Sequence, residues 1–128
     1  MKKIVPLMLL FCVAFAITST AFAAINADPE FQSASITLTS SKLAVYSADL
    51  HNEKDRIEVV EADLYKKVNG DWTHVTSLPV PAFVGTNTEL YGASISYASY
   101  IGTGTYRVTA TFSADGYEIT RNSNERTF

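Results

Sequence analysis

The chain has a single cysteine, Cys12, among its 128 residues. Because Cys12 lies in the apolar run near the start of the chain, the remaining residues cannot form a disulfide, and their stability must come from a packed core. The sequence also has only two histidines, His51 and His74, and no serine in a G-x-S-x-G motif. A hydrolase triad would have to use one of these histidines, and we expect the protein not to be an enzyme.

The one long apolar run of the sequence is N-terminal. A basic start precedes an apolar stretch over residues 4–17, and an A-x-A sequence follows at residues 21–23. This order is typical of a secretory signal peptide and its cleavage site. We therefore predict a signal peptide over residues 1–23 and a secreted mature chain over residues 24–128, long enough for one domain.

Two alternatives remain open for the N-terminal segment. Residues 4–24 are just long enough to span a bilayer if cleavage does not occur, which would leave the domain tethered. A lipoprotein site at Cys12 is the other alternative, but Phe11 stands directly before the cysteine, where lipoprotein processing sites have a small residue. Residues 122–128 form no apolar tail, so we expect no stable membrane anchor after cleavage.

The sequence has an excess of negative charge. Its 10 basic and 13 acidic side chains give a formal charge of −3, and loss of Lys2 and Lys3 leaves 8 basic side chains and a charge of −5. A domain of this charge repels nucleic acid and anionic lipid surfaces. We expect no nucleic-acid partner.

Apolar and polar residues alternate along the mature chain with the period of two that is typical of strands. The pattern is clearest over residues 33–39 and 106–112, and a predicted turn over residues 113–116 follows the second of these strands. A further strand over residues 43–47 precedes a polar loop over residues 49–55. About seven short strands and no helical window predict an all-β fold, an antiparallel immunoglobulin-like β-sandwich.

The longest predicted strand covers residues 56–67. Its apolar phase slips by one residue between Val59 and Val60 without a turn signal, which indicates a β-bulge. Asn69-Gly70 then predicts a two-residue hairpin turn, with a return strand over residues 72–78.

Two sequence segments carry a resemblance to known proteins. The segment Gly104-Thr105-Tyr106-Arg107-Val108 is similar to the start of strand F in immunoglobulin-like domains, where the tyrosine forms the tyrosine corner. Val108 stands where an antibody domain has its second cysteine, so an antibody-type core is not supported. Together with residues 64–72, this segment makes the mature chain resemble small exported proteins of Gram-positive bacteria that are catalogued only as uncharacterised. The resemblance implies a bacterial immunoglobulin-like or fibronectin-like sandwich and no catalytic residues.

The predicted loop over residues 49–55 is the candidate metal site. Calcium prefers oxygen ligands from acidic loops of this kind. The spacing fits no EF-hand, however, since the central glycine and the terminal glutamate are missing. We expect a solvated loop and no cofactor, with bound calcium as the alternative. Its candidate ligands are Asp49, Asn52, Glu53 and Asp55.

Residues 85–104 are rich in tyrosine, serine, threonine, glycine and asparagine. The same residue types dominate antibody binding loops, because tyrosine offers a large amphipathic area at a low entropy cost. Tyr91 and Tyr100 are therefore candidate binding residues, as is Trp72, the only tryptophan.

These patterns favour an exported, non-enzymatic binding or interaction module whose partner is an extracellular protein or a glycan. A small secreted effector, such as an inhibitor, an immunity factor or an antibacterial protein, is the alternative function. A hydrolase that uses His51 or His74 is the third hypothesis, and we expect it to be wrong.

Overall fold

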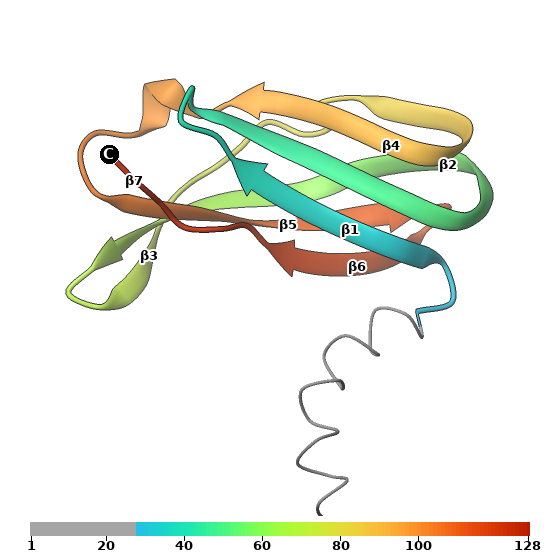
Figure 1. The fold of residues 1–128 in the computed structure, drawn as a ribbon, viewed down its shortest axis with the longest axis horizontal. Coiled ribbons are helices and arrows are strands. Elements are labelled where there is room, and N and C mark those ends of the chain that lie inside the picture. The colour runs from blue at the N-terminus through green and yellow to red at the C-terminus, as the bar shows by residue number, and fades with distance from the viewer. Residues whose placement is uncertain (1–27) are drawn as a thin grey trace, which may run out of the picture.

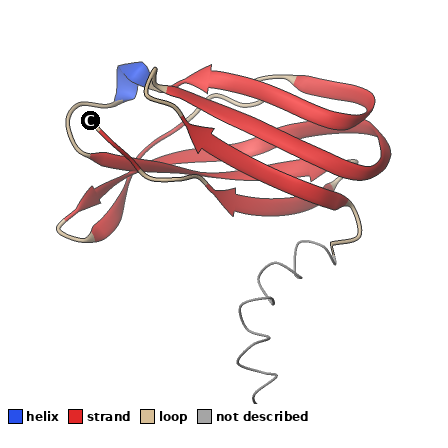
Figure 2. Cartoon of the chain, viewed as in Figure 1, coloured by secondary structure: helices blue, strands red, loops and turns tan. Residues whose placement is uncertain are grey.

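The fold consists almost entirely of antiparallel strands (Figures 1 and 2). A computed structural model describes residues 28–128, so the predicted signal peptide and Cys12 lie outside the described residues. The helical part of the described chain is one 3-10 turn, and it contains no helix long and apolar enough to cross a bilayer. The elements are β1 (Phe31–Leu38), β2 (Leu43–Val68), β3 (Asp71–Ser77), β4 (Val84–Ser96), η1 (Ala98–Tyr100), β5 (Thr105–Ala114), β6 (Tyr117–Asn122) and β7 (Arg126–Thr127).

Strand β2 organises the fold, because it pairs with four of the other six strands. Residues 43–50 of β2 lie between β1 and β4, and residues 54–58 still pair with β4. From residue 57 onward β2 pairs with β5, and its last residues, 63–68, also pair with β3. Strand β6 then continues the sheet beyond β5. The seven strands thus form one antiparallel sheet that curls over into a half-barrel (Figure 1), and the all-β prediction is confirmed.

The predicted polar loop over residues 49–55 is wrong. These residues are extended and belong to β2, because Asp49 pairs with Ser33 of β1 and with Leu90 of β4. Leu50, next to it, is only 2% exposed. The register of β2 against β4 shifts between Asp49 and Lys54, where the sheet passes from one half of the curl to the other. Pairing with non-local strands, which local composition does not reveal, makes this polar segment a strand.

The predicted β-bulge is confirmed. The register of β2 against β5 shifts between Val59 and Glu61. Val59 and Ala62 both point into the core, whereas Val60 is the extra residue and is 37% exposed. One inserted residue therefore keeps both apolar phases of β2 on the inner face.

Both predicted turns are also confirmed. Asn69 and Gly70 have φ values of 53° and 86°, and Asp115 and Gly116 have φ values of 48° and 92°. Positive φ at both central positions is the geometry of hairpin turns whose twist matches the flanking strands. Asn, Asp and Gly tolerate it best among the residue types.

The core fills the inside of the curled sheet. Phe112 of β5 lies at its centre, with ring centroids 6.4 Å from Phe31, 6.3 Å from Tyr46 and 6.5 Å from Tyr91. Strand β4 begins at Val84 and so carries Tyr91 into this cluster.

Candidate functional site

Five large side chains share the outer, solvent-facing side of β3, β5 and the second half of β2. Lys67 pairs with Trp72, and Tyr65 pairs with both His74 and Arg107. Residues directly opposite each other on antiparallel strands point to the same side of a sheet. We call this surface, formed by Tyr65, Lys67, Trp72, His74 and Arg107, the aromatic face.

Two cations lie against the ring of Trp72. The Arg107 guanidinium carbon is 4.5 Å from the ring centroid, and Lys67 Nζ is 5.4 Å from it. Lys67 Nζ also lies 3.6 Å from Glu125 Oε1. Each cation–π contact at such a site contributes about 0.5–1 kcal/mol. The indole of Trp72 is therefore held in a defined position while it remains partly exposed.

The hairpin of β2 and β3 extends away from the core (Figure 1). None of the seven residues of β3 is buried. Trp72 also does not pack against the core cluster, unlike Ile95 and Phe128. The position of Trp72 thus depends on the turn at Asn69 and Gly70 and on the two cations, and core packing contributes little.

His74 is bound to the carboxylate of Asp63. His74 Nε2 lies 2.9 Å from Asp63 Oδ1, and the Ser77 hydroxyl donates to the same oxygen at 2.8 Å. The ring of Tyr65 meets His74 edge-on, with centroids 5.5 Å apart. A hydrolase triad needs the histidine between the serine and the carboxylate. Here the carboxylate lies between them, so His74 is not positioned to take the proton of Ser77.

Tyr91 lies in the core rather than at the surface. It is 4% exposed, and its hydroxyl donates to the carbonyl oxygen of Phe83 at 2.6 Å. Burial raises the pKa of this hydroxyl above its ordinary value. Tyr91 pairs with Ala48, an inward residue of β2, which determines its orientation. The expectation of a binding side chain at Tyr91 is therefore wrong.

Tyr100 ends the 3-10 turn η1 and is 39% exposed. Its amide donates to the carbonyl oxygen of Tyr97 at 3.1 Å. In Figure 2 this turn lies at the upper edge and the β2–β3 hairpin at the lower edge of the same end of the molecule, with the C-terminus between them. Tyr100 and Trp72 therefore do not form one binding site, and a binding role for Tyr100 stays a prediction.

The four candidate calcium ligands do not converge. Asp49 is partly buried between β1 and β4, whereas Asn52 and Glu53 are exposed at the bend of β2. The amide of Asp55 donates to Asp115 Oδ2 at 3.2 Å. Within residues 28–128, no three His, Cys, Asp or Glu side chains are grouped closely enough to hold a metal ion. The structure therefore does not support the calcium alternative.

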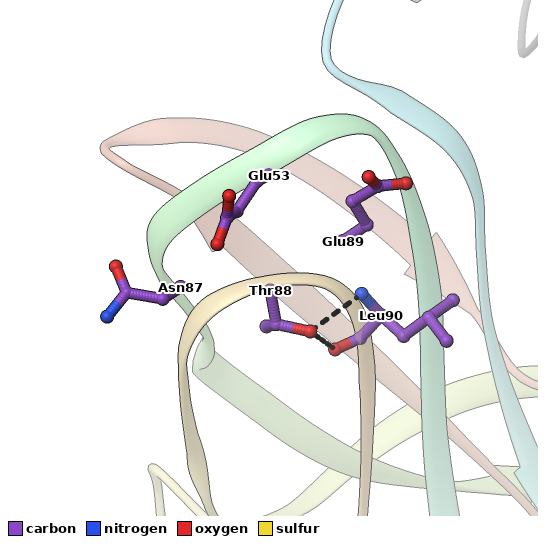
Figure 3. A pocket seen from close by; sticks show the side chains of 5 residues that line it. All are labelled: Glu53, Asn87, Thr88, Glu89 and Leu90. Atoms are coloured by element: carbon purple, nitrogen blue, oxygen red, sulfur yellow. Dashed lines mark hydrogen bonds between the residues drawn. The ribbon is translucent and has the colours of Figure 1, made fainter.

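A shallow depression lies where β2 and β4 bend (Figure 3). The Thr88 hydroxyl donates to the carbonyl oxygen of Leu90 and accepts from the Leu90 amide, both at 3.0 Å, so it serves the local turn. The depression is open and bears no side chain held ready for a ligand. It is lined by Glu53, Asn87, Thr88, Glu89 and Leu90.

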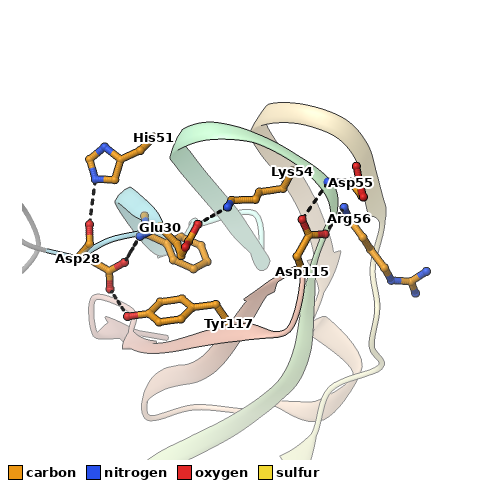
Figure 4. A network of polar contacts seen from close by, with 9 residues as sticks. Asp28, Glu30, His51, Lys54, Asp55, Arg56, Asp115 and Tyr117 are labelled. Atoms are coloured by element: carbon orange, nitrogen blue, oxygen red, sulfur yellow. Dashed lines mark hydrogen bonds and ion pairs between the residues drawn. The ribbon is translucent and has the colours of Figure 1, made fainter.

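His51 belongs to a polar network at the start of β1 (Figure 4). Its Nε2 lies 3.0 Å from the carbonyl oxygen of Asp28. The Asp28 carboxylate accepts from the amides of Glu30 and Phe31 at 2.9 and 2.8 Å, and from the Tyr117 hydroxyl at 3.2 Å. Burial opposes ionisation of Asp28, but these hydrogen bonds and the charge of Arg121 hold its pKa below the ordinary value.

The same network ties the bend of β2 to the β5–β6 turn. Lys54 forms an ion pair with Glu30. Asp115 accepts from the Arg56 amide at 2.9 Å, and its own amide donates to the Arg56 carbonyl oxygen at 2.9 Å. The charged residues around His51 therefore hold strands together, and His51 itself binds backbone.

Trp72 was predicted from the sequence as a binding residue, whereas Lys67 and Arg107, its neighbours on the aromatic face, were not. The turn at Asn69-Gly70 places Lys67 opposite Trp72 and was readable from the sequence. The contact from Arg107 was not readable, because it depends on the pairing of β2 with β5 across about 40 residues of chain, as Tyr65 with Arg107 shows.

No family model matches this chain, and no curated protein matches it in sequence.

Proposed function

We propose that this protein is an exported, non-enzymatic binding module and that the aromatic face contacts its partner. The observation that carries the proposal is the position of Trp72, which Arg107 and Lys67 hold on a hairpin outside the core. Trp, Tyr and Arg are the residue types that most often dominate binding energy at interfaces. All three types lie together on this face, as Trp72, Tyr65 and Arg107.

A binding role accounts for a cost that the fold alone does not require. Large aromatic surface left in contact with water forgoes the free energy of burial, about 25 cal/mol for each Å². Core packing uses the inner sides of β2 and β5 and leaves Trp72 outside. A partner that covers the aromatic face would bury this surface.

The strand pairing supports an immunoglobulin-like sandwich as the finer description of the fold. One half of the curled sheet has the order β1–β2–β4, and the other half has the order β3–β2–β5–β6. These orders match strands A-B-E and C′-C-F-G of such domains if the two halves of β2 act as B and C. The continuous β2 is a departure from that pattern, because B and C are separate strands in immunoglobulin domains.

Tyr106 supports the same assignment. Its hydroxyl accepts from the Gly102 amide at 3.0 Å and donates to the carbonyl oxygen of Thr103 at 3.4 Å. A buried tyrosine at the start of strand F that bonds to backbone a few residues upstream is the tyrosine corner of immunoglobulin-like domains.

Export is the part of the proposal that concerns compartment, and it rests on the signal-peptide pattern of residues 1–23. Mass spectrometry of the protein recovered from the medium of an expressing bacterial culture tests it. We expect a chain that begins at Ala24. A chain that retains residues 1–23 in the membrane fraction would contradict export.

Binding is tested by capture of secreted proteins and of purified wall glycans on the immobilised exported protein. We expect Trp72→Ala to weaken capture about tenfold or more. Ser47→Ala is the matched control, because Ser47 is exposed on the outer side of the β1–β2–β4 half. Equal capture by folded Trp72→Ala and by the unchanged chain would contradict the proposed surface. Thermal unfolding of each variant checks the fold.

A further inference from the structure

Arg107 differs from Arg56 and Arg121 in the contacts of its guanidinium. Arg56 forms an ion pair with Glu58, and Arg121 donates to the carbonyl oxygen of Thr120. Within the described chain, the Arg107 guanidinium makes no ion pair and no hydrogen bond. Its Nε is buried without a partner, as is Arg121 Nε, but no other nitrogen of Arg107 has a polar partner either. The contact with Trp72 is what positions its guanidinium.

A guanidinium in this state is prepared to bind an anion. Its planar donors match the oxygens of a carboxylate, sulfate or phosphate. A buried donor without a partner costs free energy that an arriving oxygen would recover. Stacking on Trp72 also restricts the side chain before binding, so less conformational entropy is lost when a ligand arrives.

The contacts of Trp72 argue against a neutral sugar. A sugar ring that stacked on the indole surface covered by Arg107 would have to displace the guanidinium, and Lys67 also lies over the ring. An anionic group can contact both cations while they stay in place. The aromatic face is thus better suited to a charged ligand than to a neutral one.

Charge is distributed unevenly along the molecule, in a way that favours an anion at this end. Nine of the 13 carboxylates belong to the segment that leads into β1, to the parts of β2 and β4 around their bends and to the β5–β6 turn, which lie at one end of the molecule (Figure 1). They are Asp28, Glu30, Asp49, Glu53, Asp55, Glu58, Glu89, Asp115 and Glu118. Five of the eight basic residues of the described chain belong to the β1–β2 turn, the β2–β3 hairpin, the start of β5 and β7, which lie at the opposite end (Figure 1): Lys42, Lys66, Lys67, Arg107 and Arg126. Because Asp63 and Asp71 of the hairpin and Glu125 beside β7 are also there, this end has a small excess of positive charge. This separation lets a domain of net negative charge attract a polyanion to one end.

The rest of the outer side of β5 and β6 favours a polysaccharide over an acidic peptide. The Thr109 hydroxyl donates to Asn122 Oδ1 at 2.6 Å, and the hydroxyl oxygens of Thr111 and Thr120 are 2.8 Å apart. These groups continue from Arg107 along one surface, on which Thr120 and Asn122 are exposed whereas Thr111 is only 8% exposed. The exposed hydroxyl and amide groups can form hydrogen bonds with the hydroxyl groups of sugars.

We propose that the aromatic face binds an anionic polysaccharide and that Arg107, held on Trp72, makes the principal contact with its acidic groups. This inference rests on the proposed function, since it names the class of ligand for the same surface.

Titration of the exported protein with polygalacturonate, dextran sulfate and neutral dextran tests the inference. We expect binding to one or both anionic polymers, none to dextran, and an affinity that falls as salt is raised. Arg107→Gln should weaken binding tenfold or more, and Arg107→Lys should weaken it less. Arg56→Gln is the matched control, because its guanidinium lies at the carboxylate-rich end and should not affect binding.

Two results would overturn the anion inference and leave the proposed function standing. One is equal binding of dextran and the anionic polymers; the other is a Trp72→Ala variant that loses a captured partner while Arg107→Gln retains it. Competition by polyglutamate as strong as by the polysaccharides would instead assign an acidic polypeptide, contrary to the proposal. Absence of binding to every polymer also overturns it, whereas the proposed function fails only if Trp72→Ala retains every captured partner.

Discussion

The tyrosine-rich segment of β4 and the hairpin of β2 and β3 use their aromatic residues in opposite ways. Tyr91 of β4 is 4% exposed, and its ring packs against Phe112. Trp72 of the hairpin lies outside the core, held by charged side chains. Composition marks both as binding residues, but only one reaches the surface. Whether an aromatic residue packs in the core or lies at the surface is therefore set by the side of the strand on which it lies.

Loss of the two rings should separate these roles most clearly. We expect Tyr91→Ala to lower the free energy of unfolding by about 3–5 kcal/mol, because it leaves a cavity beside Phe112. Trp72→Ala should cost about 1–2 kcal/mol, the value of two cation–π contacts at an exposed site. Urea denaturation of both variants measures the difference. Equal losses in the free energy of unfolding would contradict the assignment of Tyr91 to the core and of Trp72 to the surface.

Two glycines of β4 provide the next test. A Cβ at Gly85 would lie 2.9 Å from Ile57 Cγ2, whereas one at Gly92 would have no heavy atom within 4 Å. We expect Gly85→Ala to destabilise by about 1–3 kcal/mol, because Ile57 is fully buried and cannot move aside. Gly92→Ala should be neutral within about 0.5 kcal/mol or slightly stabilising. Thermal denaturation distinguishes them, and a neutral Gly85→Ala would show that β4 is not packed tightly there.

The hairpin half of the comparison depends on Gly70. Its φ of 86° strains any residue with a Cβ, so Gly70→Ala should destabilise by about 1 kcal/mol. Trp72 is the only tryptophan, so its fluorescence should also change if the turn positions it. Gly102→Ala is the control, since nothing lies within 4 Å of its added Cβ. Unchanged fluorescence in Gly70→Ala would mean that the two cations suffice to hold the indole.

The smallest effect is expected for the hydroxyl of Tyr46. This buried oxygen has no hydrogen-bond partner within residues 28–128, so Tyr46→Phe should be neutral or slightly stabilising. Tyr91→Phe should instead cost about 1 kcal/mol, because it removes the hydrogen bond to Phe83. A cost for Tyr46→Phe equal to that of Tyr91→Phe would reveal a partner for the hydroxyl.

The buried hydroxyl of Tyr46 should also make stability depend on alkaline pH. Burial, and to a lesser extent the nearby Tyr91, raises the pKa of Tyr46 from 10.0 to about 12. The unfolded chain therefore releases this proton first, so stability is fully present below pH 10 and is lost between pH 10 and 12. We expect Tyr46→Phe to lose less stability than the unchanged chain over this range, as measured by urea denaturation at each pH. Parallel losses would contradict the assignment.

Local patterns predicted much of the fold because their causes are local. The turns at Asn69-Gly70 and Asp115-Gly116 need positive φ, which few residue types tolerate. The bulge at Val60 appears in the sequence as a slip in apolar phase. Residues 49–55 were misassigned for the opposite reason, because their strand pairing comes from β1 and β4.

The all-β class, the two hairpin turns and the tryptophan beside one of them follow from local sequence patterns. The inward position of Tyr91 and the contact of Arg107 with Trp72 follow from the arrangement of the strands. The physical reason is that side-chain alternation is local, whereas register between distant strands depends on the packing of the whole sheet. The candidate site depends on that register, because β5 brings to Trp72 a charge that lies 35 residues later in the chain.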